Sequence, residues 1–248
     1  MAKVIEKVAP LKRYVCAIES IEYFNHDTRR VLLTLPIDAD VDFKAGQYLN
    51  VVLPDKLCPF SIASPPSLKG KIELHIKPTP DSADSVQIEQ LLDNAKSLEI
   101  ELPQGDCFVE TAPHRTLILM AASTGITQMK SIIEHLAANK LSHPIYLYWG
   151  VIADEDLYLA ELCNTWKATD EHFHFIPVVS EPSTSPDWRG RTGLVPDAVL
   201  EDFSDLEDVS VIVGGSPGMV YATLDRFVAS GMPAKNMASD VFSYAPRK

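Results

Sequence analysis

The chain has 248 residues, of which 46% are hydrophobic and 23% are charged, a composition typical of globular proteins large enough for two domains. Its net charge of −12, from 22 basic and 34 acidic residues, argues against nucleic acid or an anionic membrane as a partner. No apolar run reaches the about 18 residues that suggest a membrane span, and residues 1–7 lack the apolar core of a signal peptide, so we expect a cytoplasmic protein.

Residues 1–109 contain short segments with β character, separated by turn residues. Residues 71–77 alternate clearly, with Ile72, Leu74 and Ile76 on one face. The expected strands cover residues 12–24, 28–35, 43–53, 57–64, 71–77 and 98–102, and one helix is expected over 82–94. Six short strands and one helix predict a small antiparallel β-barrel, closed or nearly closed.

The pattern changes near residue 110, where strands begin to alternate with helices. Residues 117–122 form an apolar run without alternation, as expected of a parallel strand covered on both faces. The expected strands are residues 116–122, 144–151, 173–180, 209–214 and 238–242, and the expected helices are 126–139, 155–168, 195–203 and 218–230. This order predicts an α/β domain over residues 110–248, with a doubly wound parallel sheet of the nucleotide-binding kind.

Small residues and glycine follow several of these strands. The turns are residues 122–125 (Ala-Ser-Thr-Gly), 149–150 (Trp-Gly), 180–181 (Ser-Glu) and 214–218 (Gly-Gly-Ser-Pro-Gly). The first lies at a helix N-terminus, where free N–H groups and the helix dipole can receive a phosphate. It matches neither GxGxxG nor a P-loop, so a common strand-to-helix turn with a threonine cap is an alternative for it alone. Several such turns at one sheet edge favour a nucleotide-binding crevice.

The cysteines and histidines do not predict a metal site. Four cysteines, Cys16, Cys58, Cys107 and Cys163, are far apart and form no CxxC motif, so neither zinc nor an iron–sulfur cluster is expected and the thiols should be reduced. A histidine pair at 172 and 174 would share one face of a strand but has no third ligand nearby.

Several motifs along nearly the whole chain resemble the ferredoxin–NADP reductase superfamily, and within it the NAD(P)H:flavin oxidoreductases, including those associated with bacterial bioluminescence. These motifs are specific as a set. They are residues 43–49 (Phe-Lys-Ala-Gly-Gln-Tyr-Leu), 58–64 (Cys-Pro-Phe-Ser-Ile-Ala-Ser), 72–76 (Ile-Glu-Leu-His-Ile), 148–150 (Tyr-Trp-Gly), 188–193 (Trp-Arg-Gly-Arg-Thr-Gly) and 239–242 (Ser-Asp-Val-Phe).

The resemblance implies that the barrel binds a flavin and the α/β domain binds NAD(P)H. Ser61 would then be the catalytic residue, with its hydroxyl at the flavin N5 that receives the hydride. The implied flavin-binding residues are Tyr48, Pro59, Phe60, Ser61, Ile62, Ala63 and His75. The implied NAD(P)H-binding residues are Ser123, Thr124, Gly125, Trp149, Gly150, Arg191, Gly214, Gly215, Ser216 and Pro217. The chain end, with Asp240, Phe242 and Tyr244, would either approach the flavin ring or pack as an ordinary C-terminus.

Four positions depart from the family pattern. Cys58 replaces the arginine that pairs with a flavin phosphate, which fits a flavin used as a diffusible substrate but also fits a degraded site. Residues 122 and 123, alanine and serine, replace two glycines and narrow the approach to the pyrophosphate. Glu181 stands where related reductases often carry an arginine for the 2′-phosphate of NADP, so NADH should serve at least as well as NADPH. Arg191, with Arg189, is the cation expected near the dinucleotide.

The resemblance therefore predicts a flavin reductase that uses NADH or NADPH to reduce riboflavin, FMN or FAD. Its partners would be these small molecules and a flavin-dependent oxygenase that uses the reduced flavin. One alternative is a reductase with tightly bound FAD that feeds a separate oxygenase or iron protein, and another is reduction of ferric chelates through released reduced flavin. A nucleotide-binding module that has lost catalysis is the alternative of a different class.

Overall fold

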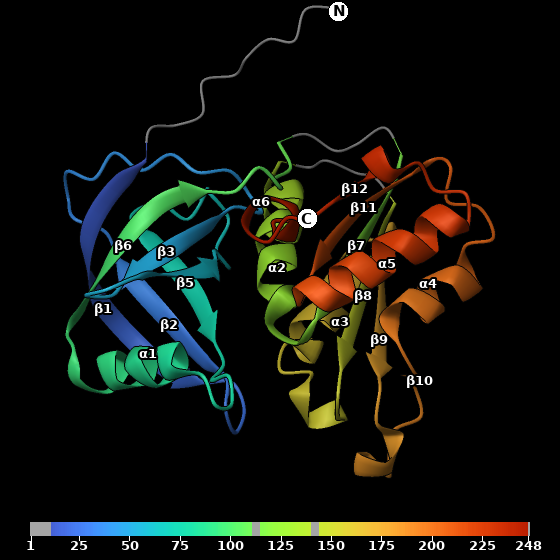
Figure 1. The fold of residues 1–248 in the computed structure, drawn as a ribbon, viewed down its shortest axis with the longest axis horizontal. Helices are drawn as coiled ribbons and strands as arrows, with labels where there is room; N and C mark the ends of the chain where they lie inside the picture. Colours follow the sequence, from blue (N-terminus) through green and yellow to red (C-terminus); the bar gives the residue numbers. More distant parts are fainter. Residues whose placement is uncertain (1–10, 111–114, 140–143, 248) are drawn as a thin grey trace, which may run out of the picture.

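The computed structural model describes residues 11–110, 115–139 and 144–247. Figure 1 shows two units side by side, a curved antiparallel sheet and a parallel sheet with helices on both faces. The fold class predicted from the sequence is thereby confirmed. The predicted domain boundary, between residues 109 and 110, lies next to residues 111–114, which are outside the described residues, so it stays a prediction.

The N-terminal sheet curls into a nearly closed barrel. Its strands are antiparallel neighbours in the order β4-β3-β6-β1-β2-β5. The sheet's two outer strands meet where the backbone N–H of Ala63 donates to the carbonyl of Glu73 over 2.8 Å. The bounds are β1 Lys12–Tyr23, β2 Arg29–Thr34, β3 Tyr48–Val52, β4 Leu57–Ser61, β5 Lys71–Ile76 and β6 Ser97–Gln104. Helix α1, Ala83–Asn94, packs Ile88 and Leu92 into the barrel core.

Strand β3 is shorter than the predicted strand over residues 43–53. Gly46 adopts φ +106°, and a Cβ there would lie 2.7 Å from the carbonyl oxygen of Cys107, so the chain turns sharply against its neighbour. The side-chain oxygen of Gln47 accepts a hydrogen bond from the backbone N–H of Lys44 and closes the turn. The strand therefore begins only at Tyr48.

The C-terminal sheet is parallel, with strand order β10-β9-β8-β7-β11-β12. The chain builds one half outward from β7, then returns and adds β11 on the other side of β7. This reversal makes the gap between the ends of β7 and β11 the topological switch point, where sheets of this kind bind ligands. The bounds are β7 Thr116–Ala122, β8 Ile145–Val151, β9 Phe173–Val179, β10 Arg191–Thr192, β11 Val209–Gly214 and β12 Met237–Ala238.

The two faces of this sheet are covered by different helices. Leu117, Leu119 and Ala121 pack with α2 and α3, whereas Ile118 and Met120 pack with α4 and α5. Burial on both faces explains why the sequence of β7 has no alternation. The helix bounds are α2 Ile126–Ala138, α3 Ala160–Thr169, α4 Val195–Asp202, α5 Pro217–Ala229 and α6 Val241–Tyr244.

Several predicted elements of this half differ from the structure. The predicted strand 238–242 is wrong, because pairing stops at Ala238 and α6 follows. The predicted helix 155–168 begins only at Ala160, after a 3-10 turn at Asp154–Asp156. A second 3-10 turn, Ser123–Gly125, precedes α2, and no side chain caps that helix, so the threonine cap is absent. The two-residue strand β10 was not predicted.

Helix α2 joins the two units through polar contacts with the barrel. Gln128 Nε2 donates to the carbonyl of Gly46 over 2.7 Å, and Ser131 Oγ donates to the carbonyl of Ser64 over 2.8 Å. These buried hydrogen bonds hold the start of α2 against the barrel, beside the switch point. Among the described residues, no helix combines the length and apolarity needed to cross a membrane.

Candidate active site

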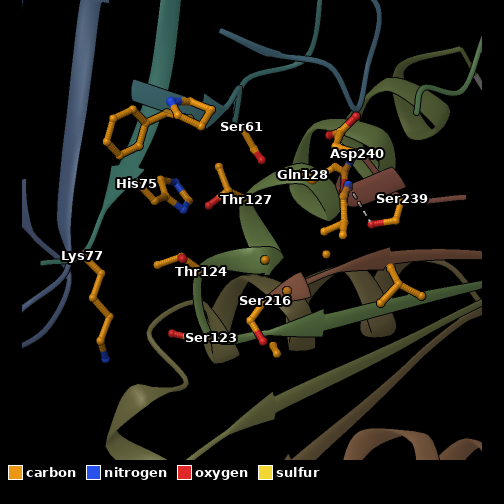
Figure 2. Close-up of a pocket in the computed structure, with 18 of the residues that line it drawn as sticks. Ser61, His75, Lys77, Ser123, Thr124, Thr127, Gln128, Ser216, Ser239 and Asp240 are labelled. Atoms are coloured by element: carbon orange, nitrogen blue, oxygen red, sulfur yellow. Dashed lines mark hydrogen bonds between the residues drawn. The ribbon is translucent and has the colours of Figure 1, made fainter. Parts of the chain in front are cut away.

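A pocket of about 440 Å³ opens at the switch point, between the barrel and the carboxyl edge of the parallel sheet. Figure 2 shows side chains from both units pointing toward it: Ser61 and His75 from the barrel, and Ser123, Thr124 and Ser216 from the turns after β7 and β11. The structure therefore brings most of the predicted flavin and NAD(P)H residues to one cavity.

The barrel contributes the end of β4 and the neighbouring strand β5. Pro59, Phe60, Ser61 and His75 line the pocket, as expected of flavin-binding residues. Tyr48, Ile62 and Ala63 do not line it. The strand partner of Ser61 is Tyr48, while Ile62 and Ala63 are fully buried behind the wall.

Cys58 does not face the pocket. It is buried in the barrel core, where burial raises the pKa of its thiol. A neutral buried thiol cannot pair with a phosphate as the arginine that the resemblance implies at this position would.

The turns after β7 and β11 touch each other, and glycine allows this contact. A Cβ at Gly125 would collide with the carbonyl of Gly214. Ser123 adopts φ +50°, a conformation that favours glycine, and its carbonyl accepts a hydrogen bond from the Trp149 indole over 2.9 Å. The turn thus keeps a glycine-like backbone although a serine occupies it. Gly214, Gly215 and Ser216 line the pocket beside it.

A second pocket of about 390 Å³ adjoins the first along the sheet edge. The two share Lys77, Ala122 and Ser123 in their linings. The lining of the second is mainly apolar, with Gly150 and Ser180 at the strand ends and the exposed side chains of Ile152 and Leu194. Together the pockets form a groove that runs from the barrel across the carboxyl ends of β7 and β8.

Three of the predicted NAD(P)H residues lie outside both linings. Trp149 is fully buried and supports Ser123 from behind, and Pro217 begins α5 after the cap residue Ser216. Arg191 donates to the carbonyl of Ala198 and forms an ion pair with Asp202 on α4. The arginine that lines the second pocket is instead Arg226, which forms an ion pair with Asp197. The sequence did not predict this role for Arg226, because the position of Arg226 at the pocket depends on how α5 packs.

Lys77 was also missed, although it borders both pockets. Its ammonium lies 3.0 Å from Asp27 Oδ2 and 3.0 Å from Asp156 Oδ1. His26 brings a ring nitrogen within 4.8 Å of these carboxylates, which makes the three residues a cluster of metal-ligand type. Because the Lys77 ammonium already pairs with both carboxylates, we assign no metal to this cluster.

Asp240 lies on the side of the pocket opposite His75 (Figure 2). Burial, and after it the nearby charge of Asp106, raise the pKa of Asp240 to about 7, against the lowering effect of hydrogen bonds from the backbone of Cys107 and from Gln128. Gln128 Nε2 donates to Asp240 Oδ2 over 2.9 Å. The chain end thus approaches the pocket through Asp240 and Tyr244, whereas Phe242 packs against Tyr221.

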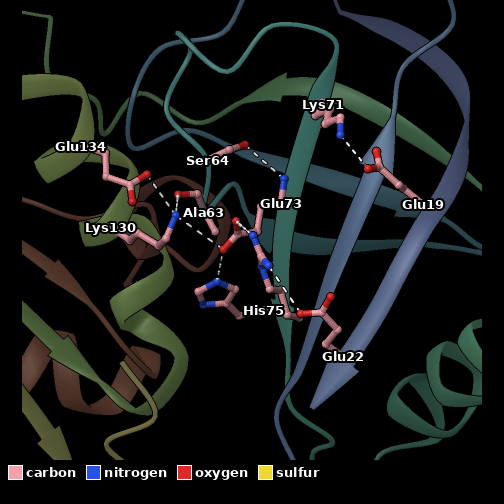
Figure 3. Close-up of polar contacts among 10 residues, drawn as sticks. Glu19, Glu22, Ala63, Ser64, Lys71, Glu73, His75, Lys130 and Glu134 are labelled. Carbon is pink, nitrogen blue, oxygen red and sulfur yellow. Dashed lines mark hydrogen bonds and ion pairs between the residues drawn. The ribbon is translucent and has the colours of Figure 1, made fainter. Parts of the chain in front are cut away.

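A buried ionic network lies behind His75, between the barrel and α2 (Figure 3). His75 Nε2 lies 2.8 Å from Glu73 Oε1, and Lys130 Nζ lies 3.5 Å from the same oxygen. Burial alone would raise the pKa of Glu73, but the hydrogen bond with His75 and the charges of Lys130 and Arg30 lower it to about 2. Burial lowers the pKa of His75, so the ring that borders the pocket is neutral near pH 7.

Comparisons with known proteins agree with this geometry. Residues 15–108 match the model of the oxidoreductase FAD-binding domain, and residues 119–225 match that of the oxidoreductase NAD-binding domain. The NAD(P)H-flavin reductase of Vibrio harveyi is 34% identical over 236 residues, covering 92% of this chain and 98% of that protein. The CDP-6-deoxy-L-threo-D-glycero-4-hexulose-3-dehydrase reductase of Yersinia pestis is 33% identical over 231 residues, covering 93% and 69%.

A solved structure shows the same arrangement of both units. The cytochrome P450 reductase of Amycolatopsis superposes with a TM-score of 0.83 at 26% identity, over 93% of this chain and 70% of that one. The resemblance inferred from the sequence motifs is thus confirmed. The chain belongs to the family of oxidoreductases that join an FAD-binding barrel to an NAD-binding domain, the ferredoxin–NADP reductase superfamily with its NAD(P)H-flavin reductases.

Proposed function

We propose that the protein is an NAD(P)H:flavin oxidoreductase that supplies reduced flavin. The observation that carries this proposal is the first pocket, which places Ser61 of the barrel and the small-residue turns of the parallel sheet on one cavity, beside the second pocket. A groove of this kind can hold a flavin ring against the barrel and a dinucleotide along the sheet edge.

The lining residues fit a flavin on the barrel side. Pro59 and Phe60 offer an apolar wall, and Ser61 offers a hydroxyl that can donate or accept a hydrogen bond. When both reactants are bound, NAD(P)H supplies a hydride and the flavin accepts it.

The chain's own contribution is positioning and exclusion of water. Ser61 orients the reactive edge of the ring, while residues 123–125 and 214–216 offer backbone N–H groups and space for the dinucleotide. The adenosine half would lie in the second, more apolar pocket. Trp149 and Arg191 act from outside the groove, by supporting Ser123 and by fixing α4.

We infer that the flavin is a diffusible substrate. Cys58 is buried and uncharged, and among the described residues that line the first pocket, Lys77 is the one with a cationic side chain. Since Lys77 is shared with two carboxylates, a flavin phosphate finds no dedicated arginine. Riboflavin should therefore be reduced about as well as FMN.

The coenzyme choice depends on two charged residues of opposite sign near the second pocket. Glu181 directly follows Ser180 of the lining, and its carboxylate would repel a 2′-phosphate. Arg226 lines the pocket but is paired with Asp197. We therefore keep the prediction that NADH serves at least as well as NADPH.

An electron-transfer reductase with bound FAD is the second candidate. The Yersinia pestis relative, a dehydrase reductase that is longer than this chain, favours it. In that case the acceptor would be a separate oxygenase or iron protein, whereas the first candidate delivers reduced flavin to a flavin-dependent oxygenase. We place either activity in the cytoplasm, in keeping with the four free cysteines.

The visible spectrum of the purified protein, followed by NADH oxidation with and without added flavin, separates the candidates. A colourless protein that oxidises NADH only when riboflavin or FMN is supplied supports the diffusible-flavin proposal. A yellow protein that NADH bleaches supports the second candidate. A protein that oxidises NADH under neither condition contradicts both.

A further inference from the structure

A short segment before α3, residues 154–158, ties the NAD-binding unit to the barrel. Lys77 Nζ at the end of the barrel pairs with Asp156 Oδ1 over 3.0 Å. Two residues further along the segment, the hydroxyl of Tyr158 pairs with His75 Nδ1 over 3.1 Å. These contacts are separate from those of α2, so the two units are joined at a second place beside the first pocket.

The hydrogen bond between Tyr158 and His75 has a defined direction. Glu73 is a carboxylate and can only accept, so His75 Nε2 donates to it over 2.8 Å. Burial lowers the pKa of His75 and keeps the ring neutral, so Nδ1 carries no hydrogen and accepts from the hydroxyl of Tyr158. Both ring nitrogens of His75 are therefore engaged inside the protein, which fixes the orientation of the ring.

The ring of Tyr158 connects the same histidine to the turn after β7. It meets the indole of Trp149 in a T-shaped contact, with ring centroids 5.3 Å apart and an angle of 89° between the planes. The indole Nε1 donates to the carbonyl of Ser123 over 2.9 Å and supports the left-handed backbone of that residue. Phe24 of the barrel stacks on Tyr158 at a centroid distance of 5.0 Å. A chain of contacts thus runs from His75 to Ser123 by way of Tyr158.

Both ends of this chain line the first pocket (Figure 2), whereas Tyr158 is not among the lining residues. His75 belongs to the barrel wall, where the proposed function places the flavin, and Ser123 belongs to the turn that would receive the dinucleotide. Hydride transfer needs the two reacting rings in contact and aligned, and a displacement of about 1 Å can cost about 100-fold in rate. A residue that fixes one wall against the other can therefore control the rate without touching a reactant.

We propose that Tyr158 is a positioning residue for hydride transfer, which holds the wall at His75 in register with the turn at Ser123. It acts on the barrel through its hydroxyl and on the parallel-sheet unit through its ring. This inference rests on the proposed function and adds to it a residue outside the pocket.

The test removes the hydrogen bond and keeps the aromatic ring. Tyr158→Phe breaks the bond from one side, and His75→Gln breaks it from the other, because a glutamine amide can still donate to Glu73 but has no counterpart of Nδ1. The matched control is Tyr148→Phe. The hydroxyl of Tyr148 donates to Asp202 Oδ2 over 2.7 Å, and neither residue lines either pocket.

Two measurements distinguish positioning from a merely structural role. The first is kcat and KM with NADH and riboflavin. The second is the dissociation constant of riboflavin, from its fluorescence, with and without saturating NAD⁺, which cannot donate a hydride. The ratio of these two constants is the coupling between the ligands, and it reports whether the two rings meet in the pocket.

We expect Tyr158→Phe to lower kcat about 10-fold while both KM values stay within about 2-fold of the original protein. NAD⁺ should strengthen riboflavin binding about 5-fold in the original protein and less than about 2-fold in Tyr158→Phe. The double variant with His75→Gln should lose no more kcat than His75→Gln alone, because the two changes break the same bond. Tyr148→Phe should keep kcat and coupling within about 2-fold, although each phenylalanine variant should lower the thermal midpoint by about 2–4 °C.

The inference is overturned if Tyr158→Phe keeps its kcat, or if Tyr148→Phe loses as much. It is also overturned if Tyr158→Phe lowers kcat equally with and without His75→Gln, because the hydroxyl would then not act through the histidine. Should Tyr158→Phe not fold, normal coupling in His75→Gln overturns it. An original protein that binds both ligands without transferring hydride contradicts the proposed function, and the coupling then decides the role of Tyr158. An original protein that binds neither ligand overturns both proposals.

Discussion

Asp240 should make the stability of the protein fall as the pH rises through neutrality. Its pKa is raised from 3.8 to about 7 in the fold, chiefly by burial. Between these values the folded chain holds a proton that the unfolded chain has released, so unfolding becomes more favourable as the pH increases. Above about pH 7 both states have lost the proton, and the dependence ends.

The size of the effect follows from the two pKa values. At 1.36 kcal/mol per pKa unit, the ionisation of Asp240 costs about 4 kcal/mol more in the folded chain than in the unfolded chain. Between about pH 5 and about pH 8.5, linkage predicts a loss of about 3 kcal/mol of the free energy of unfolding from this group. For a chain of this length, that equals roughly 6–12 °C in Tm.

The perturbation is Asp240→Asn, which imitates the protonated carboxyl. Asparagine is uncharged and still offers an oxygen to Gln128, which donates to Asp240 Oδ2. His75 acts in the opposite direction below about pH 6.5, because burial lowers its pKa and the unfolded chain then binds the proton. The quantity to compare is therefore the difference between the variant and the original protein at each pH.

Thermal unfolding followed by circular dichroism measures this difference. We expect Asp240→Asn to gain about 3 kcal/mol relative to the original protein when the pH goes from about 5 to about 8.5. Asp38→Asn, at an exposed position after β2, serves as the control for the loss of one carboxylate. A difference for Asp240→Asn that is constant over this range would refute the reasoning, since the carboxyl would then be ionised throughout.

Three further predictions concern catalysis, the interface and coenzyme choice. Ser61→Ala should lower kcat by about 10-fold or more with little effect on the KM for flavin, and an unchanged kcat would remove Ser61 from the proposed role. Lys130→Met should cost about 2–4 kcal/mol in chemical denaturation, because Glu73 stays buried with one cation fewer. A loss below about 0.5 kcal/mol would show that Arg30 and His75 suffice. Arg226→Ala should reduce kcat/KM about 10-fold for NADPH and about 2-fold or less for NADH, and equal losses would mean that Arg226 does not meet the 2′-phosphate.

The sequence predicts the fold well wherever local pattern and tertiary packing agree. Strand β7 is apolar after Thr116 because both of its faces are covered, and the helical spacing that begins at Ile126 matches α2. The expected last strand failed for the opposite reason. Residues 238–242 include the β-forming Val241 and Phe242, but Asp240 turns toward Gln128, 112 residues earlier in the chain, and the backbone closes into α6. A contact at that separation leaves no local signal.

The sequence predicted part of the candidate site. The residues that it missed reach the site through contacts between distant parts of the chain. Motif positions such as Ser61 and Gly214 carry a local requirement, a strand end or a close approach, so they can be found in a sequence. Charged residues carry no such requirement. Arg191 is the cation that a loop motif suggests, yet it pairs with Asp202, while Arg226 reaches the groove from the face of a helix. Whether Arg191 or Arg226 lies at the groove depends on how the helices pack against the sheet.

The charge arrangement of the groove explains how a chain with a net charge of −12 can still serve a polyanionic coenzyme. Each cation on the groove is already neutralised: Lys77 by Asp27 and Asp156, and Arg226 by Asp197. A bound phosphate must therefore compete with a carboxylate for either cation, and the dinucleotide depends more on backbone N–H groups at the two glycine-bearing turns. Such a site binds its coenzyme less tightly than one with unpaired arginines would. Weak retention suits the proposed use of a diffusible flavin, in which both reactants leave after each hydride transfer.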